Sequence, residues 1–275
     1  MADTRPATHH TAAPFAGLER RAICWLLALP ILPHYLNDIY LVLLHRWYVR
    51  PVTVGGAVRP MASTEGIWWM WSLDFVVYLG IPLVIMWHYA RRGWFPWAAY
   101  GFRPGQWLPG IAVGLGLALL GWLPMALAHQ HWGDWLGGLL PHVSYAPFFV
   151  GKKAGVLAWL LVSLYIALGA GFLEEYLYRA FLIRGLERVG LRPWQAGGVA
   201  IVVFVFIHAV AGVYVWLVAL WVGLVFTVYY IRFRNIYPLV VAHVAIDLFW
   251  ASGLEGRLFA AIFQEAQRLP MLQTP

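Results

Sequence analysis

Long apolar stretches separated by short polar segments dominate the pattern of this chain. A helix needs about 20 mostly apolar residues to cross the hydrocarbon core of a bilayer, and seven stretches come close to that length. The predicted spans are Ala22–Leu44, Gly66–His88, Leu108–Ala128, Gly155–Phe172, Trp194–Val210, Val213–Ile231 and Pro238–Leu254. The sequence therefore predicts an all-α fold, a polytopic transmembrane helical bundle of about seven to eight spans.

Domain organisation follows from the same pattern. Residues 1–20 are rich in Pro, Thr and Ala and predict a flexible N-terminal tail, without the small-residue cleavage site of a signal peptide. Residues 21–275 show no internal repeat, no low-complexity tract and no second domain. We expect them to form a single transmembrane domain.

Composition agrees with a membrane location. Hydrophobic residues make up 62% of the chain, charged residues only 11%, and there are 17 Trp, which is unusual for a soluble domain. The net charge of +7 does not indicate nucleic acid, because Lys and Arg are scattered and form no continuous basic stripe. The single cysteine, Cys24, excludes an internal disulfide.

The distribution of basic residues predicts the orientation. If the N-terminus is cytoplasmic, basic residues concentrate on the cytoplasmic side, whereas Lys152 and Lys153 lie outside. The cytoplasmic set includes Arg20, Arg21, Arg91, Arg92, Arg184, Arg188, Arg192, Arg232 and Arg234. We expect a multi-pass protein of a cell membrane, a bacterial inner membrane from the compactness of the chain, with its site towards the cytoplasm.

Three short polar motifs interrupt the apolar helices of the C-terminal half. They are Glu174-Glu175-x-x-x-Arg179, Phe204-x-x-x-His208 and His243-x-x-x-Asp247. Ionisable side chains are costly in hydrocarbon and are tolerated where they meet partners or water. We therefore expect the three motifs to form one polar site; the alternative is that the glutamates are solvated at the end of a span.

Helical spacing separates the two glutamates. Glu175 and Arg179 are four residues apart, share a helix face and predict an ion pair. Glu174 points about 100° away, has no such partner and is the better candidate for chemistry. Asp247 shares a face with His243 and is expected to orient its ring. The same spacing at His34 and Asp38 predicts only a polar patch at the interface, and Asp74 receives no role.

Together these motifs resemble a known family. The order Glu174-Glu175-Tyr-Leu-Tyr-Arg179-Ala-Phe-Leu, Phe204-Val-Phe-Ile-His208 and His243-Val-Ala-Ile-Asp247 is similar to that of the CPBP intramembrane proteases. That family includes the CAAX prenyl endopeptidases and the abortive-infection proteins. The resemblance covers about residues 155–254, which is where we expect the catalytic core.

The resemblance implies an intramembrane endopeptidase of the glutamate type, without a cofactor, that cleaves near the C-terminus or membrane-proximal part of a protein or peptide substrate. It implies that Glu174 and His208 activate water and that His243 and Asp247 line the oxyanion site. Glu175 and Arg179 would support the structure. Many members have Asn where this chain has Asp247, and ionised Asp cannot donate a hydrogen bond to an oxyanion.

Two alternatives remain open from the sequence. Glu174, His208 and His243 are also an acceptable set of zinc ligands, because catalytic zinc accepts two His and one Glu. A bacteriocin-immunity protein could keep the same motifs without catalysis. A transporter is less consistent with the pattern, because the chain lacks the paired repeats of that class. The sequence does not identify the substrate.

Overall fold

The computed structural model describes residues 14–54, 57–62, 73–96, 101, 107–137, 164–165, 167, 169–208 and 213–252. Apart from one hairpin and the turns that connect the elements, these residues are helical, which confirms the predicted helical class. The helical elements are α1 (Arg20–Tyr48), η1 (Asp74–Gly80), α3 (Ile81–Arg91), α4 (Trp107–Gly137), η4 (Gly169–Leu182), α7 (Ile183–Arg188), α8 (Pro193–Phe206), α9 (Val213–Phe233) and α10 (Tyr237–Ser252).

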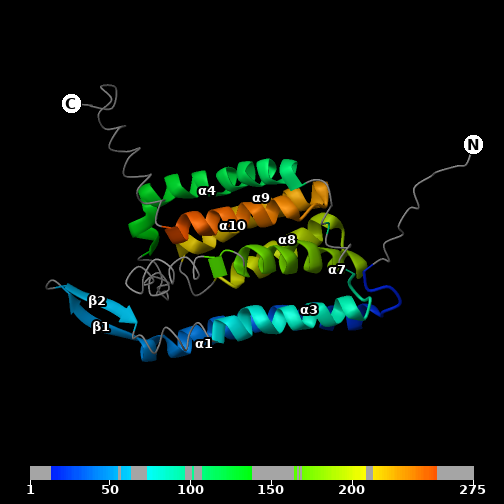
Figure 1. The fold of residues 1–275 in the computed structure, drawn as a ribbon, viewed down its shortest axis with the longest axis horizontal. Helices are drawn as coiled ribbons and strands as arrows, with labels where there is room; N and C mark the ends of the chain where they lie inside the picture. Colours follow the sequence, from blue (N-terminus) through cyan, green and yellow to red (C-terminus); the bar gives the residue numbers. More distant parts are fainter. Residues whose placement is uncertain are drawn as a thin grey trace, which may run out of the picture.

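The hairpin was not predicted from the sequence. Strand β1 (Val49–Val54) pairs antiparallel with β2 (Ala57–Ala62), with Val49 opposite Ala62 and Val54 opposite Ala57. It follows directly on α1, where the apolar helical pattern gives way to β-branched Val and Thr residues that favour extended backbone. The hairpin projects from one end of the bundle (Figure 1).

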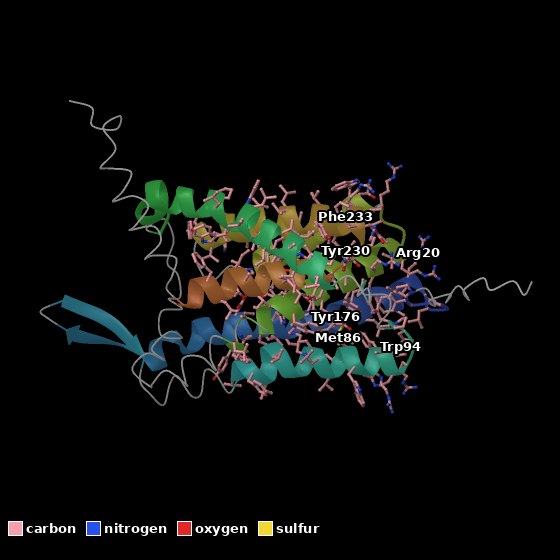
Figure 2. All side chains as sticks on the ribbon, turned by 45° about the horizontal axis from the view of Figure 1, so that its top comes forward. Arg20, Met86, Trp94, Tyr176, Tyr230 and Phe233 are labelled. Carbon is pink, nitrogen blue, oxygen red and sulfur yellow. The ribbon has the colours of Figure 1, made fainter. Side chains whose placement is uncertain are left out.

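The helices form a layered bundle with η4 at its centre. Helices α1 and α3 run side by side along one side, and α4, α9 and α10 form the opposite side (Figure 1). Element η4 packs against α1, α8, α9 and α10, and Figure 2 shows Tyr176 of η4 in the middle of the bundle. Almost all η4 side chains are buried, so its polar residues face protein on every side.

Elements η1 and η4 are π-helices, whose backbone hydrogen bonds run from residue i to i+5. Their turns are wider than those of an α-helix, so consecutive side chains diverge by less than the ~100° assumed from the sequence. As a result, both Glu174 and Glu175 turn towards α10.

Gly171 brings η4 and α10 into close contact. A Cβ atom at this position would lie 2.6 Å from the Val244 side chain and 2.9 Å from its backbone nitrogen. Only glycine allows this approach, in the way that small residues let membrane helices pack closely. Because Val244 follows His243, the contact also sets the distance between His243 and the two glutamates.

The ends of several helices gather at one end of the bundle. Arg20 begins α1, Arg91 ends α3 and Arg234 follows α9, where it pairs with Glu187 of α7 at 2.5 Å. Figure 2 shows Arg20, Trp94 and Phe233 at this same end. The predicted cluster of basic residues on one side of the membrane therefore corresponds to one end of the fold.

The packed domain begins earlier than predicted. Phe15 lies within the tail expected for residues 1–20, yet its side chain is fully buried against Phe95 and Phe181. Its backbone N–H donates to the carbonyl of Trp94 at 2.5 Å. The prediction for this segment differs from the structure because the surrounding sequence is rich in Pro and Thr, which is typical of a flexible tail. A single buried aromatic ring is enough to anchor it. Residues 1–13 of the predicted tail lie outside the described residues.

The apolar helices are consistent with a membrane protein, whereas the number of spans stays a prediction. Among the described helices, Arg20–Tyr40 and Val213–Phe233 are long and apolar enough to cross a bilayer. Leu108–Pro124, Pro193–Phe206 and Tyr237–Phe249 are shorter apolar segments. Most of the predicted span Gly155–Phe172, together with Lys152 and Lys153, lies outside the described residues.

Candidate active site

A buried ion pair lies at the base of the site. Arg179 Nη1 is 3.1 Å from Glu175 Oε1, and the two side chains are 1% and 0% exposed. This confirms the pair predicted from helical spacing. The Arg179 guanidinium also lies 4.0 Å from the centre of the Phe204 ring, a cation–π contact that is stronger away from water. Phe204 therefore holds Arg179 in place, and its ring also lies 4.8 Å from that of His208, measured between ring centres.

His243 is oriented by Glu175. The Nδ1 atom of His243 lies 2.7 Å from Glu175 Oε1 and donates to it. Its other nitrogen, Nε2, lies 3.8 Å from Glu174 Oε2 and 3.8 Å from Asp247 Oδ2. The expectation that Asp247 orients the ring by a hydrogen bond is wrong. Because η4 packs closely on α10, Glu175 lies within hydrogen-bond distance of His243 Nδ1. This contact joins two helices, so residue spacing within α10 could not predict it.

Glu174 has a partner from a distant part of the chain. The hydroxyl of Tyr78, in η1, donates to Glu174 Oε1. The other oxygen, Oε2, is buried and has no hydrogen-bond partner among the described residues. Glu174 is only 3% exposed, so the alternative of a solvated glutamate at a span end is wrong. The absence of a partner within its own helix was correctly expected, but Tyr78 was missed.

His208 lies just beyond the end of α8. Its Nδ1 donates to the carbonyl of Phe204 at 2.9 Å, which satisfies one of the carbonyls left open at a helix C-terminus. Trp216 of α9 holds the His208 backbone by donating to its carbonyl at 3.0 Å. With its proton on Nδ1, the ring keeps Nε2 as an acceptor. Electrostatic interactions connect His208 and His243 with Glu174.

The three motifs thus converge on one buried polar site, formed by η4, α10 and the end of α8. It contains the six predicted residues Glu174, Glu175, Arg179, His208, His243 and Asp247. Asp247 is 20% exposed and marks the more open side of this group.

A second group of polar residues adjoins Glu174 and was missed. His34 and Asp38 of α1 are 0% and 9% exposed, so the polar patch expected at the interface is wrong. The signal was present, because they have the same spacing as His243 and Asp247. Asp74, which had no assigned role, accepts hydrogen bonds from Asn37 at 2.9 Å and Tyr165 at 2.8 Å.

The geometry of the site does not favour the zinc alternative. Within the described part of the chain, no group of three or more His, Cys, Asp and Glu side chains is arranged to hold a metal ion. As arranged in the described residues, Glu174, His208 and His243 therefore do not form such a group.

Comparison with known proteins identifies the region that carries the site. The family model for type II CAAX prenyl endopeptidase Rce1-like proteins matches residues 156–249. The match spans all three motifs, from Glu174 to Asp247. It begins after α1 and η1, so it does not include these two helices. No curated protein and no solved structure matches the chain. Residues 156–249 of this chain are therefore similar to the Rce1-like type II CAAX prenyl endopeptidases, a family of membrane proteases.

Proposed function

We propose that this membrane protein is a glutamate-type intramembrane endopeptidase. One observation carries the proposal: Glu174 is held through Oε1 by Tyr78, while its buried Oε2 keeps its lone pairs and faces His243 at 3.8 Å. A fixed carboxylate with one oxygen available, beside two histidines, is the arrangement that general-base activation of water requires.

The proposed reaction is the hydrolysis of a peptide bond. Glu174 Oε2 takes a proton from water, which His208 Nε2 helps to hold, and the water oxygen attacks the scissile carbonyl. When His243 carries protons on both nitrogens, Nδ1 donates to Glu175 and Nε2 donates to the oxyanion. A donor of this kind contributes about 3 to 4 kcal/mol. Glu174 then transfers its proton to the leaving amine as the bond breaks.

We propose that the substrate is a membrane-associated protein or peptide, cleaved near its C-terminus or close to the membrane. The family match supports the class of substrate without specifying whether it is lipidated. By the positive-inside rule, the basic end of the bundle faces the cytoplasm. A cytoplasmic entrance to the site and a bacterial inner membrane stay predictions.

The test compares membrane proteomes of strains that carry wild-type protein or Glu174→Gln, at matched levels of expression. Proteins with unprocessed C-termini should accumulate in the variant strain, and a synthetic peptide from such a C-terminus should be cleaved only by the wild-type enzyme. If the two strains contain the same C-termini, the endopeptidase proposal is wrong. Protection from a bacteriocin that survives Glu174→Gln would instead support the immunity alternative.

Metal removal gives a second test. We expect the purified enzyme to retain its activity on this substrate peptide after prolonged chelation and to contain zinc well below one equivalent, because Glu174 and His208 activate the water. Metal analysis and activity are measured on the same samples. Stoichiometric zinc, lost together with activity and restored with it, would contradict the proposed mechanism.

Asp247 provides a further test, because it replaces the Asn that many relatives of this kind have. Its Oδ2 lies 3.8 Å from His243 Nε2, where an amide could donate to the oxyanion. We expect Asp247→Asn to keep most of the wild-type kcat and Asp247→Ala to lose clearly more. Equal kcat values in wild type, Asn and Ala would place Asp247 outside the reaction.

A further inference from the structure

Tyr78 connects the proposed catalytic carboxylate with the N-terminal half of the molecule. It belongs to η1 and donates to Glu174 Oε1, although it lies far outside the region that matches the family. A carboxylate has two equivalent oxygens and can rotate about its terminal bond. A donor on one of them fixes the carboxylate plane and leaves the other directed at the reacting water.

His34 of α1 holds Tyr78 in place. The two rings stack with their centres 4.0 Å apart and 13° between their planes. His34 Nε2 lies 3.1 Å from the backbone oxygen of Tyr78. A carbonyl oxygen only accepts hydrogen bonds, so Nε2 carries the proton and donates. His34 therefore fixes both the ring and the backbone of Tyr78.

His34 also contacts η4 directly, through Tyr178. His34 Nδ1 lies 2.8 Å from the hydroxyl of Tyr178, and a neutral ring with its proton on Nε2 accepts from that hydroxyl. Tyr178 is four residues after Glu174 in η4. Glu174, Tyr78, His34 and Tyr178 thus form a closed series of contacts that joins α1, η1 and η4.

We propose that Tyr78 is a positioning residue that directs Glu174 Oε2 towards water, and that His34 acts on the reaction through Tyr78. This inference rests on the proposed function of Glu174. In this proposal α1 and η1 contribute His34 and Tyr78 to the active site, in addition to packing against the other helices. We take the expected size of the effect from residues that orient metal ligands, whose removal lowers activity about 10- to 100-fold.

The test begins with Tyr78→Phe, assayed with the substrate peptide defined above. We expect kcat to fall about 10- to 100-fold with KM unchanged, because only the orientation of Glu174 is lost. Tyr89→Phe is the matched control: it removes a tyrosine hydroxyl that likewise bonds a neighbouring helix, at the carbonyl of Leu26 in α1 at 3.0 Å, but away from Glu174. A rise in KM or a fall in melting temperature, without a fall in kcat, overturns the positioning role.

A double-mutant cycle tests the role of His34. His34→Ala should lower kcat, and Tyr78→Phe combined with His34→Ala should be no worse than the more severe single variant, since both act through one contact. His34→Gln should restore part of the activity, because its amide can donate to Tyr78 and accept from Tyr178. Independent, multiplying losses in the double variant overturn the proposed coupling.

A comparison of Tyr78→Phe with Glu174→Gln separates this inference from the proposed function. If Glu174→Gln is inactive while Tyr78→Phe has the kcat of wild type, only the positioning role fails. If Glu174→Gln is fully active, the proposed function itself fails.

Discussion

Glu174→Gln is expected to lower kcat by about 100- to 10,000-fold, the range that general-base catalysis contributes. The loss should be confined to catalysis, because the amide oxygen of Gln can still accept the hydrogen bond from Tyr78. KM and the melting temperature in detergent should therefore stay close to those of the wild type. Single-turnover cleavage of the substrate peptide and thermal unfolding of size-homogeneous protein measure the two effects separately.

Glu187→Gln is the matched control for this experiment. Glu187 lies on α7, which continues directly from η4, and it pairs with Arg234 at the basic end of the bundle. Its replacement should leave kcat unchanged. Full activity in Glu174→Gln, or an equal loss in both variants, would remove Glu174 from its assigned role.

Arg179→Ala should have the largest effect on stability. It leaves Glu175 buried without its guanidinium partner, and removing one member of a buried ion pair typically costs about 3 to 5 kcal/mol. The cation–π contact with Phe204 is lost as well. We expect a clear fall in melting temperature and yield, together with reduced activity, because Glu175 also orients His243.

Arg184→Ala gives the comparison that this prediction needs. Arg184 lies on α7, is 35% exposed and approaches Glu187 only to 4.0 Å. Ion pairs of this exposed kind contribute about 0 to 1 kcal/mol. Thermal unfolding of the two variants side by side should therefore show a large difference. If Arg179→Ala is as stable as Arg184→Ala, the buried pair does not stabilise η4.

Much of the candidate site is predictable from the sequence because its motifs are local. The pairing of Glu175 with Arg179 depends only on residues four apart in one helix. The grouping of the three motifs follows from the cost of placing isolated ionisable groups in hydrocarbon. The helical class follows from the length of the apolar stretches. Each of these properties is contained in one segment of the chain, so no knowledge of packing is needed.

The partners of the key residues could be decided only by the tertiary structure. Glu175 rather than Asp247 orients His243, because Gly171 lets η4 approach α10 and because a π-helix turns both glutamates to the same side. Tyr78 and His34 lie 96 and 144 residues from their contacts in η4, and no periodicity relates positions that far apart. The sequence by itself determined which residues are polar and buried in apolar helices. Which of them touch depends on how those helices pack, since contacts between helices are set by the shapes of both surfaces.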